Sequence, residues 1–187
     1  ETYYAAACSG YVCHTINPRL FPEQVTYIIN HAEDQYVFLD PDFLPLVEGV
    51  APACPGVKGW VVLTTEEHMP ETRLANVLCY ETLVAAGDTS FEWPQLDENA
   101  ACALCYTSGT TGNPKGATLT HHNIVNNAHF IAAAMNFTES DSLCIPVPLY
   151  HCFGMVLAVL ACVDSGARMV FPGEAFEPLA TLQAVAE

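Results

Sequence analysis

The stretch YTSGTTGNPKG, residues 106–116, lies between two apolar runs, ACALCY (101–106) and GATLT (116–120). It contains three glycines, four Ser and Thr hydroxyls and one cation, Lys115. A continuous apolar run such as 101–106 predicts a buried strand, and 116–120 predicts a second, shorter strand. The sequence therefore predicts a polar, glycine-rich loop whose two ends are fixed by strands.

This loop has two interpretations. Glycines let backbone N–H groups turn toward an anion, hydroxyls donate to phosphate oxygens or bind Mg²⁺, and a lysine supplies a compact positive charge. A flexible linker has a similar composition, but a linker does not need apolar strands on both sides. A Walker A loop is disfavoured, because Pro114 precedes Lys115 and Gly116 follows it, where G-x-x-x-x-G-K-[ST] is required.

The composition limits the partners that the chain can bind. Its 187 residues carry a net charge of −16, and 14% of them are charged, against about 25% in a typical globular domain. A nucleic-acid surface needs clustered cations, and an anionic membrane repels an acidic chain. The five Lys and Arg residues are scattered: Arg19, Lys58, Arg73, Lys115 and Arg168. We therefore expect no nucleic-acid or membrane partner.

Apolar periodicity divides the chain into two blocks, 1–90 and 91–187. In the first block the predicted strands span 10–16, 35–40 and 59–64, and the predicted helices begin at Pro22 and span 42–50 and 77–86. The inner face of the helix that begins at Pro22 is predicted to hold Val25, Ile28, Ile29 and Ala32. Acidic, proline-bearing loops at 64–72 and 87–99 separate the blocks. Strands and helices at this spacing indicate an α/β fold, with mostly parallel sheets and flanking helices.

The second block continues the alternation after the glycine-rich loop. Its further predicted strands span 142–147 and 167–171, and its predicted helices span 121–136, 152–164 and the last residues. Thr120 is predicted to cap the first of these helices, whose inner face would hold Ile124, Ala128, Ile131 and Met135. The uncharged segment 143–163 is interrupted by Pro146, Pro148 and His151, so we expect a buried core helix and no transmembrane segment.

Nine cysteines, an odd number, lie mostly in apolar runs, where free cysteine behaves as a small buried hydrophobe. Cys102 and Cys105 form the only C-x-x-C pair, and positions three apart on a strand point to opposite faces. We therefore expect no zinc site. A reducing cytoplasm is the predicted location.

Residues 104–116, LCYTSGTTGNPKG, closely resemble the phosphate-loop signature of the adenylate-forming enzymes, which include acyl-CoA synthetases, luciferases and peptide-synthetase adenylation domains. Residues 14–34 and 148–154 (PLYHCFG) resemble the acyl-CoA ligase branch. Residues 14–24 and 91–99 are similar to ligases for medium-chain or methylthio-substituted acids, whereas 148–154 is similar to fatty acyl-CoA synthetases. The resemblance covers the chain and implies part of the large N-terminal domain.

The resemblance implies a reaction in which a carboxylate attacks the ATP α-phosphorus, releases pyrophosphate and forms an acyl-adenylate, from which coenzyme A displaces AMP. It implies phosphate contacts from Thr107, Ser108, Gly109, Thr110, Thr111, Gly112 and Lys115, with Thr110 also a Mg²⁺ ligand. Lys115 and His151 would act in catalysis. Tyr150 and His151 would line the acyl and adenylate pocket, although a lone histidine beside an apolar helix is more often a core residue.

The predicted function is ATP-dependent activation of a fatty acid of medium to long chain to acyl-CoA, with ATP, Mg²⁺ and coenzyme A. One alternative is an adenylating enzyme that passes its acyl group to another acceptor, such as a carrier protein. Another is a non-catalytic nucleotide-binding module. The family's Tyr-Gly-x-Thr-Glu motif, ribose-binding Asp and C-terminal catalytic Lys do not occur here, and both ends are predicted to be cut. We therefore expect residues 1–187 alone to be inactive.

Overall fold

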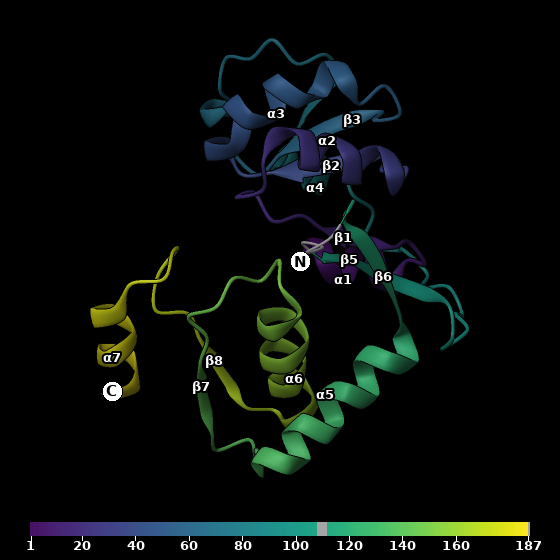
Figure 1. The fold of residues 1–187 in the computed structure, drawn as a ribbon. Coiled ribbons are helices and arrows are strands. Elements are labelled where there is room, and N and C mark those ends of the chain that lie inside the picture. The colour runs from purple at the N-terminus through teal and green to yellow at the C-terminus, as the bar shows by residue number, and fades with distance from the viewer. Residues whose placement is uncertain (108–111, 187) are drawn as a thin grey trace. The chain divides into compact units, whose positions relative to one another are not determined.

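The structure is a computed structural model that describes residues 1–107 and 112–186 (Figure 1). It contains two compact units, and neither is a continuous stretch of sequence. Unit 1 comprises Glu1–Asn17, Pro94–Cys105 and Ala117–Glu187, and unit 2 comprises Pro18–Trp93 and Tyr106–Gly116. The two sequence blocks, 1–90 and 91–187, remain a prediction. The described residues of the glycine-rich stretch group with unit 2. The strand before it begins in unit 1, and the strand after it ends in unit 1.

Unit 2 is built on a parallel three-stranded sheet in the order β2-β3-β4. Strand β3 is central and buried along its whole length, because it is paired on both edges. The strands are β2 (Tyr36–Leu39), β3 (Gly59–Val62) and β4 (Val77–Cys79), and the helices are α2 (Pro22–His31), α3 (Leu44–Val50), α4 (Tyr80–Ala85) and the short turns η1 (Pro41–Phe43), η2 (Ala51–Ala53) and η3 (Glu66–His68). The α/β prediction is confirmed.

Helix α2 begins where the sequence predicts. Pro22 is its first residue, and the Gln24 side chain accepts a hydrogen bond of 3.2 Å from the Phe21 N–H, which satisfies a backbone donor at the helix start. Val25, Ile28 and Ile29 are buried as predicted. Ala32 is only half-buried, because it lies after the last helical residue.

The predicted helix at 77–86 is wrong in its first turn. Val77–Cys79 form strand β4, and only Tyr80–Ala85 are helical. Strand β4 pairs with the buried β3 in the register Trp60↔Val77, so sheet pairing outweighs the local helix propensity.

Unit 1 contains the sheet β1-β5-β6, of strands β1 (Cys13–Thr15), β5 (Ala101–Thr107) and β6 (Lys115–Thr120), with β1 parallel to β5. Cys102 and Ala103 have no exposed surface, which confirms the buried strand. A separate parallel pair joins β7 (Ser142–Cys144) to β8 (Arg168–Val170). The last residues of β5 and the first of β6 group with unit 2.

Helix α5 (His121–Met135) is capped as predicted: the Asn123 N–H donates to Thr120 Oγ1 at 3.1 Å. Its buried residues are Ile124, Ala128 and Ala132, so the predicted Met135, which is 49% exposed, and the half-buried Ile131 are wrong as core positions. The reason is that α5 packs on its neighbours along the ridge formed by every fourth residue.

The predicted helix at 152–164 is present, but most of it is a π-helix and not an α-helix. Residues Phe153–Leu160 form a wider π-helix, η4, followed by α6 (Ala161–Ser165), and Gly166 with a φ of 75° ends it. Met155, Ala158 and Val159 lie in the core with Ile145. Within the described residues, no helix is both long enough and apolar enough to span a membrane.

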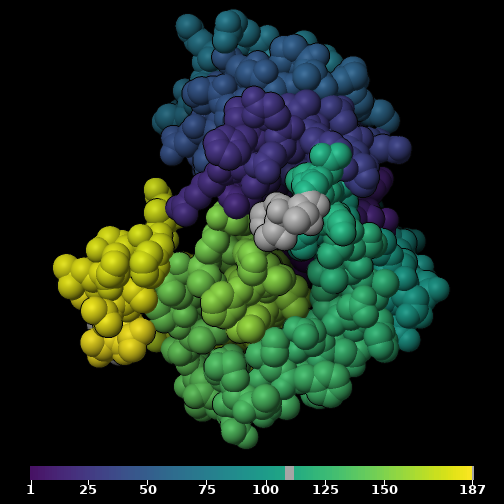
Figure 2. Space-filling model, viewed as in Figure 1, coloured from purple at the N-terminus to yellow at the C-terminus, as the bar shows by residue number. Residues whose placement is uncertain are grey.

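The two terminal helices are α1 (Thr2–Cys8) and α7 (Pro178–Ala186). Helix α7 has no buried residue, and its yellow atoms stand out from the surface in Figure 2. All nine cysteines lie within the described residues and none is in a disulfide. The same part of the chain has no cluster of three or more His, Cys, Asp or Glu residues that could hold a metal ion.

Candidate functional site

The base of the glycine-rich loop is closed by a hydrogen bond between its two strands. Thr107 Oγ1 donates to the carbonyl oxygen of Lys115 at 3.4 Å, which joins the end of β5 to the start of β6. The predicted phosphate-contacting residues Ser108, Gly109, Thr110 and Thr111 lie outside the described residues. The described members of the predicted set are therefore Thr107, Gly112 and Lys115.

Gly112 is in a conformation that side chains rarely adopt. Its φ is 114°, and a Cβ built on it would meet no atom of the described residues within 4 Å. Space is therefore not what requires glycine here; the backbone conformation is. A residue with this φ can turn its N–H in a direction that an ordinary loop residue cannot, as an anion-binding loop requires.

Lys115 differs from the other four basic residues in that its side chain has no hydrogen-bond or ion-pair partner among the residues that the structure describes. Arg73 pairs with Glu48 at 3.1 Å, Lys58 donates to Gln35 at 2.8 Å and Arg168 donates to Ser142 at 3.0 Å. Arg19 also has a partner. The Lys115 side chain is exposed, directly after the buried Pro114. Its ammonium group is therefore available to an external anion.

The entry to the loop is attached to helix α2. The Tyr106 hydroxyl lies 2.6 Å from Nδ1 of His31, and the two rings meet edge to face. His31 in turn stacks on Tyr27, with ring centroids 5.2 Å apart. Burial raises the pKa of Tyr106, and the neighbouring Tyr27 and Asp34 add to this, so the phenol stays protonated at neutral pH. Sequence analysis did not identify His31 or Tyr106 as site residues.

The second predicted region is the turn Pro148–Gly154 in unit 1, which carries Tyr150 and His151. Tyr150 is half-buried and His151 is exposed, so His151 is not a core residue. The Phe153 N–H donates to His151 Nδ1 at 3.1 Å, and Cys152 Sγ lies 3.8 Å from the same nitrogen. Because Nδ1 accepts, the neutral ring carries its proton on Nε2, which leaves a hydrogen-bond donor at the other edge of the ring.

Gly154 fixes the path of this turn. A Cβ at this position would lie 2.6 Å from the carbonyl oxygen of Pro148, closer than any side chain tolerates. The Gly154 N–H donates to the His151 carbonyl at 3.0 Å, and the π-helix η4 begins at Phe153. π-Helical turns are rare and are often found at functional sites. Sequence analysis did not predict that Gly154 fixes this turn, although a glycine three residues after His151 in PLYHCFG indicates a turn.

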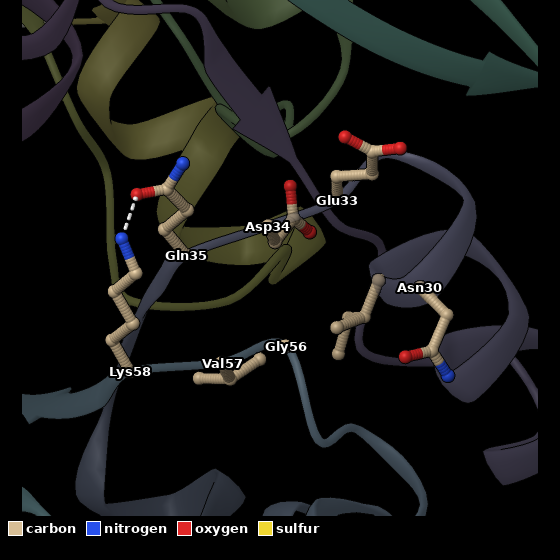
Figure 3. A pocket seen from close by; sticks show the side chains of 8 residues that line it. Asn30, Glu33, Asp34, Gln35, Gly56, Val57 and Lys58 are labelled. Carbon is tan, nitrogen blue, oxygen red and sulfur yellow. Dashed lines mark hydrogen bonds between the residues drawn. The ribbon is translucent and has the colours of Figure 1, made fainter.

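A hollow of about 260 Å³ in unit 2 does not fit an anionic ligand (Figure 3). It lies between the end of α2 and the turn before β3, and its rim carries Glu33 and Asp34. The ammonium group of Lys58 is bonded to Gln35 there. The carboxylates of Glu33 and Asp34 would repel a phosphate or a fatty acid, and the single ammonium group of Lys58 offsets only one of them, so the glycine-rich stretch remains the candidate site.

His122 has a structural partner at the start of α5: its Nδ1 lies 3.2 Å from Glu98 Oε2. The Asp40 side chain caps η1 by accepting from the Asp42 N–H at 3.1 Å. These polar residues stabilise local structure and add nothing to the candidate site.

The fold and the loop together define a class of protein. The model of the family described as AMP-binding enzyme matches residues 1–187, and the chain therefore belongs to the AMP-binding enzymes. The predicted adenylate-forming family and its acyl-CoA ligase relatives are thereby confirmed.

Among curated relatives, the chain is 42% identical over 181 residues to a medium-chain-fatty-acid–CoA ligase from Ectopseudomonas oleovorans, covering 95% of this chain and 33% of the relative. It is 44% identical over 177 residues to a 3-methylmercaptopropionyl-CoA ligase from Ruegeria pomeroyi, covering 92% of this chain and 32% of the relative. The chain thus spans about a third of the length of these relatives.

Solved structures share the fold. The anthranilate CoA ligase AuaEII, in complex with anthranoyl-AMP, has a TM-score of 0.87 at 25% identity, covering 98% of this chain and 35% of that one. ATP-bound MatB from Rhodopseudomonas palustris has a TM-score of 0.77 at 26% identity, covering 99% of this chain and 34% of that one.

Proposed function

We propose that the chain forms part of an acid–CoA ligase that activates a fatty acid of medium to long chain with ATP, first as the acyl-adenylate and then as the acyl-CoA. Support comes from the family and from two relatives whose names describe acid–CoA ligases, one of them for medium-chain fatty acids. The medium-chain end of the range is favoured by the first relative, and the acceptor is coenzyme A in both names.

The single observation that carries the proposal is that the exposed Lys115 has no partner among the residues that the structure describes. In a chain of net charge −16, a cation without a partner among the described residues attracts an anion more strongly than any neighbouring group. Adenylation gathers negative charge on the leaving pyrophosphate, and a preorganised cation stabilises that charge.

The described residues fit the polyphosphate of ATP. Lys115 supplies the charge, Gly112 supplies the unusual backbone conformation, and Thr107 joins the strands at the two ends of the loop. In this proposal Lys115 pairs with the β- and γ-phosphates and Gly112 directs a backbone N–H toward them. ATP supplies the phosphorus that the carboxylate attacks and the leaving group.

The described residues include no proposed ligand of Mg²⁺. The proposed ligand, Thr110, lies outside the described residues, so no step is assigned to the ion. His151 is proposed to line the acyl and adenylate pocket together with Tyr150, because its ring is exposed and its Nε2–H is directed away from the backbone bond at Nδ1. That donor suits a carboxylate or a phosphate oxygen.

The experiment uses a ligase of full family length that carries residues 1–187. Release of pyrophosphate is measured with ATP, Mg²⁺, coenzyme A and straight-chain acids from short to long. We expect acid-dependent release that is greatest for medium to long chains, with acyl-CoA as the product. Release that is independent of the acid, or acyl transfer only to a carrier protein, would contradict the proposal.

A further inference from the structure

A row of contacts in unit 2 connects helix α2 with Lys115. His31 is the last residue of α2 and stacks on Tyr27, one helical turn earlier, with an interplanar angle of 26°. Aromatic side chains at this spacing share one face of a helix and restrain one another. The His31 ring is therefore held in place by the helix that carries it.

The next contact crosses to the loop. His31 Nδ1 and the Tyr106 hydroxyl are 2.6 Å apart, a short hydrogen bond between residues 75 positions apart in sequence. Tyr106 is followed directly by Thr107, whose Oγ1 donates to the carbonyl oxygen of Lys115 at 3.4 Å. Two side-chain hydrogen bonds and one peptide unit thus connect the end of α2 to the backbone of Lys115.

This row of contacts is more than ordinary packing. His31 is exposed, so its imidazole contributes little to the buried core. Its hydrogen bond is made to Tyr106, which lies in strand β5 and is the first residue of that strand to group with unit 2. At such a point a side-chain bond sets where the following backbone lies, and phosphate binding is sensitive to displacements of about 1 Å.

We propose that His31 is a positioning residue for ATP: through Tyr106 and Thr107 it holds Lys115 where it meets the polyphosphate, without touching the nucleotide. This inference rests on the proposed function, because it needs Lys115 to bind phosphate. The ring stack holds His31, and the hydrogen bond transmits its position to the loop.

The test separates the stack from the hydrogen bond in a full-length ligase that carries residues 1–187. His31→Phe keeps a flat ring for Tyr27 and loses the bond, whereas His31→Asn keeps a polar atom near the place of Nδ1 and loses the ring. Tyr106→Phe removes the hydroxyl alone and tests the same bond if His31→Phe does not fold. His68→Phe is the matched control, because His68 is another exposed histidine of unit 2, hydrogen-bonded to Thr65 at 2.7 Å.

Steady-state kinetics are measured with ATP and, separately, with the acid as the varied substrate. A surface hydrogen bond of this kind changes an equilibrium about 3- to 10-fold, so His31→Phe and Tyr106→Phe should each raise KM for ATP by about that factor. The KM for the acid should change by less than about 2-fold, below the effect of one hydrogen bond, because Lys115 is proposed to contact the polyphosphate and not the acid. The double variant should be no worse than either single one. His31→Asn should recover only part of the loss, because it keeps a polar atom for the Tyr106 hydroxyl but loses the stack on Tyr27.

Equal KM values for ATP in parent and His31→Phe would overturn the inference, as would additive effects in the double variant or an equal rise for His68→Phe. Lys115→Ala is run in parallel. If Lys115→Ala also leaves ATP binding unchanged, the proposed phosphate site itself is wrong. If only His31→Phe is without effect, the site stands and the positioning role falls.

Discussion

The base of the glycine-rich loop and the turn Pro148–Gly154 present the side chains that we propose as functional in opposite ways. Lys115 is exposed, and its ammonium group has no partner among the described residues. His151 uses one ring nitrogen to accept the Phe153 N–H, so the same side chain supports the turn and faces the solvent. If both residues act as proposed, a substitution at Lys115 should change function without changing stability, whereas a substitution at His151 should change both.

The largest expected effect is at Lys115, and it tests whether the rate of adenylation can be lowered there without a loss of stability. Lys115→Ala in a full-length ligase should slow acid-dependent pyrophosphate release about 10²–10³-fold, the usual cost of losing one preorganised charged donor. The free energy of unfolding should change by less than about 0.5 kcal/mol, as for an exposed loop residue.

Lys58→Ala provides the matched control for this variant, because Lys58 is also an exposed lysine of unit 2 but donates to Gln35. Its adenylation rate should equal that of the parent. A similar loss of rate in both variants would show that general charge, and not the position of Lys115, is responsible.

The next effect tests whether the turn Pro148–Gly154 needs a residue without a Cβ at position 154. Gly154→Ala would place a Cβ 2.6 Å from the Pro148 carbonyl oxygen, so the turn must shift. We expect a loss of about 1–3 kcal/mol in the free energy of unfolding, measured by urea denaturation. Gly49→Ala is the control: a Cβ added to this helical glycine of α3 would meet no atom within 4 Å, so alanine should stabilise the protein by about 0.5–1 kcal/mol.

A smaller effect tests the mixed role of His151. His151→Asn keeps an acceptor for the Phe153 N–H, whereas His151→Ala removes it, so the alanine variant alone should lose about 0.5–1.5 kcal/mol of stability. Both variants should raise KM for the acid by a similar factor, because both lose the Nε2–H donor. Unchanged kinetics in both variants would restrict His151 to its structural role.

The smallest effect is a pH dependence in unit 2, away from both regions. The Arg73 N–H, the Thr72 hydroxyl and the Arg73 guanidinium together lower the pKa of Glu48 to about 2, from its ordinary 4.5. A lowered pKa favours the folded state above the ordinary value, and this contribution is lost as the pH falls from about 4.5 to 2. Glu48→Gln should therefore be less stable than the parent at pH 7, and the difference should vanish near pH 2.

The glycine-rich loop was predictable because its signal is contiguous: residues 106–116 carry their glycines, hydroxyls and lysine in one stretch between apolar runs. Helix α2 and the cap at Thr120 were predictable for the same reason, since caps depend on residues three or four positions apart. The bond between His31 and Tyr106 joins residues 75 positions apart, and no local pattern encodes it.

The errors have the same origin. Val77–Cys79 form a strand because β3 is beside them, and Ala132 is buried because α5 packs along a particular ridge.

The interleaving of the two units has a consequence for biosynthesis. A ribosome adds about 5–20 residues per second, so His31 leaves it about 4–15 s before Tyr106, 75 residues later. The sheet β2-β3-β4 and helix α2 are therefore complete in sequence before the glycine-rich stretch emerges. The residues that Tyr106 contacts in helix α2 are therefore synthesised before the glycine-rich stretch. Comparing refolding of the parent with that of a circular permutant that reverses this order would show whether the order of synthesis matters for folding.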